Sequence, residues 1–156
     1  MNEYEYFETM ADIGITSYGE TIEKAFENAG KGLFNIMVDI DKIDNDNDNA
    51  LGKFQIASDD LLSLLYDYLT ELLILHDSEF LLLSNFKINI ESVTEEIKSN
   101  NDEEVKEYYT LDCYYFGEEY DTKKHDAKEE VKAITYHKMN ISDNKGEFKI
   151  NFIVDL

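Results

Sequence analysis

The stretch IGITSYGETIEKAFENAGKGLFNIM, residues 13–37, changes its hydrophobic period partway along and so decides the class of fold. Its first part, Ile13–Tyr18, alternates in the manner of a short strand. Thr21 follows with a hydroxyl suited to cap a helix, and apolar residues then recur at three- and four-residue steps as far as Met37. The sequence therefore predicts a strand that leads directly into an amphipathic helix.

The rest of the chain adds a second helix and several strands. The leucine-rich segment from Leu61 to about His76 predicts a helix, and its leucines cover more than one face, so we expect it to lie against a sheet. Strands are expected at Tyr4–Phe7, around 54–56, and over 86–90, 111–115, 131–139 and 148–154, with polar connections at 94–104 and 142–147. This order predicts an α+β fold: a single compact domain, 1–156, with a β-rich antiparallel core and two main helices packed on it.

Composition narrows the classes of function. The 156 residues are 43% hydrophobic, which is enough for a core, and they carry a formal charge of −21. All fourteen basic residues are Lys, and an acidic chain repels phosphate, so we expect no direct tight binding of nucleic acid. The N-terminal segment is unlike a signal peptide, and the most apolar stretch, 61–75, is too short to cross a bilayer. These features predict a cytoplasmic protein without a membrane span.

The run DKIDNDNDNALG, residues 41–52, superficially matches the start of a calcium loop. An EF-hand loop needs Gly at position six and a bidentate Glu at position twelve. Counted from Asp44, these positions hold Asn49 and Gln55. We therefore expect this run to form a solvated turn.

Two carboxylates far apart in the sequence make a better candidate metal site. Asp12 stands where a strand begins, and Asp155 is the penultimate residue of the last strand, facing away from Phe152 and Val154. Leu156 follows with the main-chain carboxylate of the terminus. Hard oxygen ligands of this kind suit calcium or magnesium. The alternative is a pair of exposed strand-end carboxylates, because spacing alone does not show that the two residues meet.

Four segments together resemble the archease family: residues 6–39, 59–75, 117–139 and the ending FIVDL, 152–156. The resemblance implies a small, metal-binding accessory protein, not an enzyme, that activates the RtcB-type RNA ligase of tRNA splicing by promoting its guanylylation and multiple turnover. It also implies a divalent metal, calcium in the first place with magnesium or manganese as alternatives, held by Asp12, Asp155 and Leu156. The family commonly has His-Thr where this chain has Thr9 and Met10.

The block GEEYDTKKHDAKEEVKAITYHKM, 117–139, is rich in lysine. Within it we expect Lys124, His125 and Lys132 to contact the ligase or a nucleotide bound to it, and the resemblance covers these positions. The other reading is a solvated loop that leads into a strand. We expect His137, farther along that strand, to be a core histidine.

Signatures of an independent enzyme are missing from the sequence. There is no G-x-S-x-G elbow and no glycine-rich phosphate loop, and Cys113 lies beside Asp112, which discourages a thiolate. Two alternatives to the accessory protein stay open: a small stand-alone metal-dependent hydrolase, and a plain protein-interaction or chaperone-like module.

Overall fold

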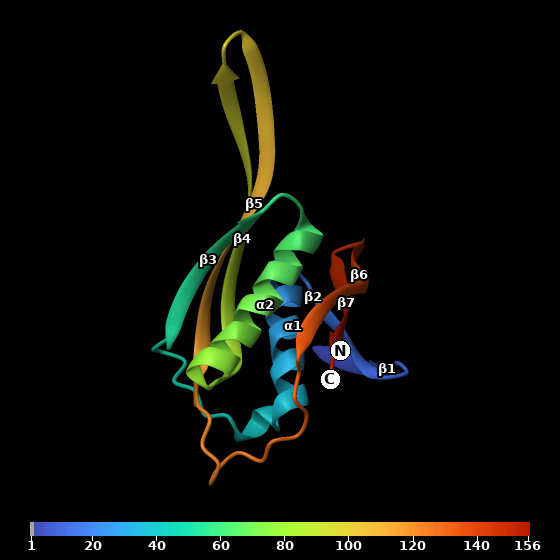
Figure 1. Ribbon diagram of the computed structural model, residues 1–156, viewed down its shortest axis with the longest axis vertical. Coiled ribbons are helices and arrows are strands. Elements are labelled where there is room, and N and C mark those ends of the chain that lie inside the picture. The colour runs from blue at the N-terminus through green and yellow to red at the C-terminus, as the bar shows by residue number, and fades with distance from the viewer. Residues whose placement is uncertain (1) are drawn as a thin grey trace.

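The computed structural model describes residues 2–156, in which two antiparallel sheets enclose a layer of two helices (Figure 1). The first sheet has the strand order β1–β2–β7–β6, and the second has the order β3–β5–β4. The strands are β1 (Tyr4–Glu8), β2 (Asp12–Gly19), β3 (Gly52–Ser58), β4 (Leu81–Ser99), β5 (Asp102–Glu119), β6 (Ala133–Asn144) and β7 (Glu147–Asp155). The helices are α1 (Ile22–Met37), α2 (Leu61–Glu79) and the short 3-10 helix η1 (Ile40–Lys42). The predicted α+β class is confirmed.

Helix α1 begins where the sequence predicts it. The Thr21 hydroxyl accepts a hydrogen bond of 3.1 Å from the backbone N–H of Lys24, which satisfies one free donor of the first turn. The apolar stripe buries Phe26 and Leu33 completely. After Met37 the backbone turns to an extended conformation, and the helix ends.

Helix α2 runs three residues beyond the predicted end at His76. The Asp60 carboxylate caps its first turn by accepting a 2.8 Å hydrogen bond from the Ser63 N–H. Phe80 closes its last turn in the left-handed conformation, with φ of 58°, a role that glycine usually fills. The helix packs against both sheets, as its spread of leucines predicts. No helix within residues 2–156 combines the length and the apolarity needed to cross a membrane.

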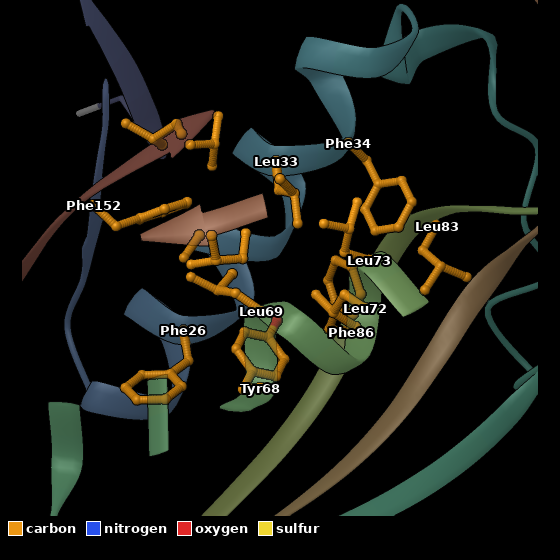
Figure 2. Packing of buried hydrophobic residues seen from close by; sticks show 14 of the residues in the cluster. Phe26, Leu33, Phe34, Tyr68, Leu69, Leu72, Leu73, Leu83, Phe86 and Phe152 are labelled. Atoms are coloured by element: carbon orange, nitrogen blue, oxygen red, sulfur yellow. The ribbon is translucent and has the colours of Figure 1, made fainter. Parts of the chain in front are cut away.

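The hydrophobic core lies in the helix layer and draws side chains from both sheets (Figure 2). Five large aromatic side chains of the core are buried: Phe26 and Phe34 of α1, Tyr68 of α2, Phe86 of β4 and Phe152 of β7. The Tyr68 ring lies 5.6 Å from the Phe26 ring and meets the Phe86 ring edge-on at 6.4 Å between centroids. These contacts join α1, α2 and β4 into one packed unit.

The predicted polar connection at 94–104 is wrong. Strands β4 and β5 continue through most of it and meet at a two-residue turn, Asn100–Asn101. Both turn residues have positive φ, 38° and 86°, which a tight hairpin turn requires and which Asn tolerates. The polar residues form a two-stranded ribbon that projects beyond the body of the molecule (Figure 1), so both of its faces meet water.

The strand expected over 131–139 is β6, but it is irregular, and the core position expected for His137 is wrong. The register of β6 against β7 shifts between Thr135 and Asn140, and Lys138 has a positive φ of 57°. Such an irregularity reverses which side chains point inward. Before the shift Ile134, opposite Val154, is the buried residue, so His137 shares the outward phase of Ala133 and Thr135; it is exposed and is not the core histidine that we expected. After the shift Met139 is buried.

One buried hydroxyl leads to a stability prediction. Tyr68 is fully buried, yet its hydroxyl oxygen has no hydrogen-bond partner within residues 2–156. An unpaired buried hydroxyl costs about 1–3 kcal/mol. We expect Tyr68→Phe to raise the free energy of unfolding by about 1 kcal/mol or more, measured by urea denaturation.

A second substitution checks the cause. A methyl group at Gly30 would lie 2.5 Å from the Tyr68 hydroxyl oxygen, so Gly30→Ala should destabilise the protein despite the better helix propensity of Ala. In the Tyr68→Phe background the cost of Gly30→Ala should fall, because the nearest atom is gone. Equal costs in the two backgrounds would show that the hydroxyl is not the source of the crowding.

Candidate functional site

The antiparallel pairing of β2 with β7 brings the two candidate carboxylates together. Asp12 stands directly opposite Asp155, and the register continues through Ile15 opposite Phe152. Because Ile15 and Phe152 are fully buried, a slip of one residue would turn the hydrophobic face of the strand to water. Directly opposed residues of an antiparallel pair project from the same face of the sheet, so the Asp12 and Asp155 side chains are neighbours.

The surroundings of this carboxylate pair suit a cation. Like charges directly opposite one another on two strands are destabilising, and within residues 2–156 neither Asp12 nor Asp155 takes part in an ion pair. Both residues are half-buried, as is Leu156 beside them. The described residues contain no group of three or more His, Cys, Asp and Glu that could hold a metal. A cation here would therefore need further oxygens, from the main chain at Leu156 or from water.

A third segment joins the same place in the structure. The backbone N–H of Lys132 donates a 2.8 Å hydrogen bond to the Asp155 carbonyl oxygen, and Ala133 pairs with Asp155 in the β6–β7 ladder. The Lys132 side chain is exposed. We name this set the carboxylate site: Asp12, Asp155, Leu156 and Lys132. All four are site residues that the sequence predicts, and the pairing of Asp12 with Asp155 together with the backbone hydrogen bond of Lys132 brings their backbones next to one another.

The turn between β1 and β2 completes the surroundings of Asp12. It contains Thr9 and Met10, at the positions where the resemblance departs from the family pattern. The Thr9 hydroxyl oxygen is buried and has no hydrogen-bond partner in the described part of the chain, whereas Met10 is fully exposed. An orphaned polar atom three residues before Asp12 is consistent with a site that takes a polar ligand.

Lys124 and His125 belong to a different cluster, built around Glu118. The Lys124 ammonium lies 2.8 Å from one Glu118 oxygen and 2.6 Å from an Asp44 oxygen. His125 Nδ1 accepts a hydrogen bond of 3.0 Å from the Asp121 N–H, so Nε2 carries the proton and donates to Glu118 at 2.9 Å. No hydrogen bond or ion pair among residues 2–156 joins this cluster to the carboxylate site.

These contacts change the expected role of the histidine. We expected His125 to face a partner, but the ring is buried with both nitrogens engaged, and it stacks on Tyr120. Its role in this structure is to hold the segment that leads to β6. Glu118, which organises the cluster, is the residue that sequence reasoning missed, because nothing in the run GEEYD distinguishes it from Glu119.

The acidic run after η1 is a turn, as expected. The Asp46 carboxylate accepts hydrogen bonds from the Asp48 N–H at 3.0 Å and from Asn49 Nδ2 at 2.9 Å, and these bonds lower the pKa of Asp46. Asp44 is tied to Lys124 instead. The oxygens of this run therefore point to different partners rather than to one centre.

The stability of the cluster depends on pH because it depends on the ionisation of Glu118. Burial acts to raise the pKa of Glu118, but hydrogen bonds from Lys124, the Asp44 N–H and His125 outweigh it and hold the pKa below its ordinary value of 4.5. A carboxyl group with a lowered pKa stabilises the folded state above the unfolded pKa. It loses that contribution as the pH falls through the folded pKa.

We therefore expect Glu118→Ala to lower the free energy of unfolding by about 1–3 kcal/mol at neutral pH, since it leaves the buried His125 N–H without an acceptor. Denaturant unfolding should show that the difference from wild type shrinks as the pH falls below 4.5. Glu119→Ala, an exposed neighbour, is the control and should change stability little. A difference that stays constant with pH would contradict a role for the ionised Glu118.

Comparison with known proteins agrees with the resemblance. The model of the Archease protein family (MTH1598/TM1083) matches residues 4–156. Protein archease of Thermococcus gammatolerans is 40% identical over 157 residues, covering 100% of both chains. Protein archease of Pyrococcus furiosus is 42% identical over 141 residues, covering 90% of this chain and 89% of its own.

Two solved structures are also similar to this chain. The solution structure of Methanobacterium thermoautotrophicum protein 1598 superposes with a TM-score of 0.77 at 36% identity, covering 100% of both chains. The crystal structure of a Thermotoga maritima protein described as "an archease, possible chaperone" has a TM-score of 0.50 at 15% identity, covering 96% of this chain and 94% of its own, and it shows the fold alone. With a family match over nearly its whole length and relatives of about 40% identity, the chain belongs to the archease protein family.

Proposed function

We propose that this protein is a non-enzymatic accessory factor that binds a divalent cation at the carboxylate site and activates an RtcB-type RNA ligase in the cytoplasm, promoting its guanylylation and multiple turnover. The observation that carries the proposal is the direct opposition of Asp12 and Asp155 across β2 and β7. Two carboxylates held this close by the sheet register repel each other unless something positive lies between them.

Calcium is the cation that the ligand chemistry fits first, with magnesium or manganese as alternatives. Asp12 and Asp155 would bind it through carboxylate oxygens, and Leu156 through its main-chain carboxylate where the chain ends there. A divalent ion in this position supplies charge neutralisation for phosphate oxygens. Lys132, whose backbone N–H bonds to the Asp155 carbonyl oxygen, adds an exposed, flexible ammonium with the same preference for phosphate.

Charge complementarity supports a ligase as the partner. An enzyme that handles RNA needs a basic surface to hold phosphates, and this chain has a formal charge of −21. Opposite potentials steer two proteins together, and an acidic partner does not compete for RNA in the way that a second basic protein would. Lys132 is the side chain that we assign to contact with the ligase or its nucleotide. Lys124 is a second candidate once its carboxylate partners are displaced.

The two alternatives predict different behaviour. Burial raises the pKa of the Cys113 thiol, which makes this cysteine a poor nucleophile. A stand-alone metal-dependent hydrolase would instead use a metal-bound water, and it would turn over a phosphoester without any ligase. A chaperone-like module, the role suggested for the Thermotoga maritima protein, would need neither the cation nor the opposed carboxylates.

Metal binding should be visible as stabilisation. At a calcium concentration of a hundred times Kd, the free energy of unfolding should rise by about 2.7 kcal/mol. Asp12→Asn should abolish this rise. In a chelator the same variant should be as stable as wild type or more stable, because one of two opposed charges is gone. Thermal melts with and without calcium, on both proteins, measure these changes.

Two controls sharpen this test. Asp48→Asn makes the same chemical change in the acidic run and should keep the full calcium response. Residues appended after Leu156 should weaken the response if its main-chain carboxylate is a ligand. Loss of the response in Asp48→Asn, or its survival in Asp12→Asn, would place the cation elsewhere.

Ligase activation is tested with an RtcB-type ligase from the same organism. We expect this protein to increase the amount of guanylylated ligase and the number of turnovers. Asp12→Asn and Asp155→Asn should lose most of the stimulation, and Lys132→Gln should reduce it about tenfold or more, as expected when a charged contact worth about 1.5–3 kcal/mol is removed.

Lys138→Gln, which changes an exposed lysine of β6, the strand that begins directly after Lys132, is the matched control and should stimulate like wild type. Turnover of a phosphoester by the protein alone would favour the hydrolase. Absence of any effect on the ligase by the wild-type protein would remove the accessory role, whatever the outcome of the calcium melts.

A further inference from the structure

The β3–β5–β4 sheet has one face toward the helices and one face away from them (Figure 1). The outer face carries two rows of side chains with complementary chemistry. In the first row Tyr114 of β5 stands opposite Lys53 of β3 on one side and Lys87 of β4 on the other. In the second row Asp112 stands between Gln55 and Asn89. We name these six residues the tyrosine platform: Lys53, Gln55, Lys87, Asn89, Asp112 and Tyr114.

The platform borders a hollow rather than a flat surface. The hollow has a volume of about 550 Å³, and five of the six platform residues line it together with Phe54 and Cys113. Binding sites for small molecules have volumes of about 300–1,000 Å³, so the space is adequate for a ligand of nucleotide size.

The first row combines one aromatic ring with two cations. Tyr114 is 46% exposed, although it lies mid-strand in a three-stranded sheet. The Lys53 ammonium lies 6.0 Å from the centre of the Tyr114 ring, and the Lys87 ammonium lies 5.9 Å from the centre of the Phe116 ring. Within residues 2–156 neither ammonium takes part in an ion pair, so both are available to an anion.

The second row offers hydrogen-bonding groups at the next step along the strands. Gln55 and Asn89 present amide donors and acceptors, and Asp112 presents an acceptor between them. Gln55 and Asn89 are exposed and Asp112 is half-buried. Residues two apart on a strand lie about 6.6 Å from one another, which places this row beside the ring of Tyr114.

From this arrangement we infer that the tyrosine platform binds one nucleotide unit, with the base stacked on Tyr114, the phosphate near Lys53 and Lys87, and the base edge against the second row. Aromatic side chains on an open sheet are a recurring way of holding unpaired bases. The inference goes beyond the proposed function, since it involves neither the cation nor the carboxylate site. The nucleotide has two sources: a free nucleoside triphosphate, or one residue of a single-stranded RNA.

The net charge limits how strongly such a site binds. The whole chain has a formal charge of −21, so it repels a long polyanion. The ammonium groups of Lys53 and Lys87 attract a phosphate only at short range. We therefore expect weak binding that depends on stacking, which agrees with the expectation that tight nucleic-acid binding is absent.

The test is a nitrogen-15 NMR titration of the full chain in a chelator, so that no cation at the carboxylate site can bridge to phosphate. ATP, GTP and a short oligouridine are the probes. We expect chemical-shift changes centred on Lys53, Gln55, Asn89 and Tyr114. Tyr114→Leu, which keeps apolar area but removes the ring, should weaken binding about 5- to 100-fold, whereas Tyr114→Phe should retain it.

Matched substitutions on other surfaces give the controls. Tyr136→Ala removes a tyrosine that is 53% exposed on β6, and Lys98→Gln removes an exposed lysine; both should bind like wild type, whereas Lys53→Gln with Lys87→Gln should not. Tighter binding of the oligouridine than of either triphosphate identifies RNA as the source, and the reverse identifies a free nucleotide. Shift changes away from the platform, equal binding by Tyr114→Leu, or no changes with any probe would overturn the inference. None of these outcomes depends on ligase activation.

Discussion

The pairing of β2 with β7 is the constraint on which the rest of this structure depends. It joins residues near the two ends of the chain, separated by 143 positions at Asp12 and Asp155, into one antiparallel ladder. Its register is fixed from the inside, because Ile15 and Phe152 must both face the helices. Once those two side chains are buried, the positions of the terminal residues of the ladder follow. The burial of these core side chains therefore keeps the like charges of Asp12 and Asp155 next to each other.

Most of the fold could be predicted from periodicity and capping residues. The Thr21 cap, the apolar stripe of α1 and the leucines of α2 are local signals, and the structure follows them. Hydrophobic periodicity does not predict how far two strands stay paired where they extend beyond the hydrophobic core. The ribbon around Asn100–Asn101 is mostly polar, with Ile97 and Val105 exposed, and its sequence is typical of a loop, although the two strands stay paired through it. The bulge between Thr135 and Asn140 has no signal in the sequence either, and it places Met139 on the inner face although His137, two residues earlier, is exposed.

The candidate site, like the fold, could be predicted from the sequence only in part. Asp12 and Asp155 could be selected because each lies at the end of a strand, where the face of the side chain is predictable, and Lys132 because of its place in the lysine-rich block, which the family resemblance also covers. Their proximity depends on strand order, which no local pattern contains. His125 was predicted to be a surface contact because the residues around it are charged, yet the ring is buried, stacked on Tyr120 and hydrogen-bonded to Glu118, five and seven residues earlier in the chain. Charged neighbours in the sequence therefore do not show whether a histidine is exposed, because the chain can fold back and pair the ring with one of those charges.

The layered architecture also bears on how the surfaces of this protein relate to one another. The carboxylate site lies on the β1–β2–β7–β6 sheet, and the tyrosine platform lies on the outer face of the other sheet, with the helix layer between them (Figure 1). Substitutions that share no contacts across such a layer act independently on stability. Any dependence of one surface on the other would therefore have to pass through a partner that touches both, or through a shift of α1 and α2 within a close-packed core. Tyr68, fully buried between Phe26 and Phe86, makes the second route costly, because moving either helix would break packing on both sides.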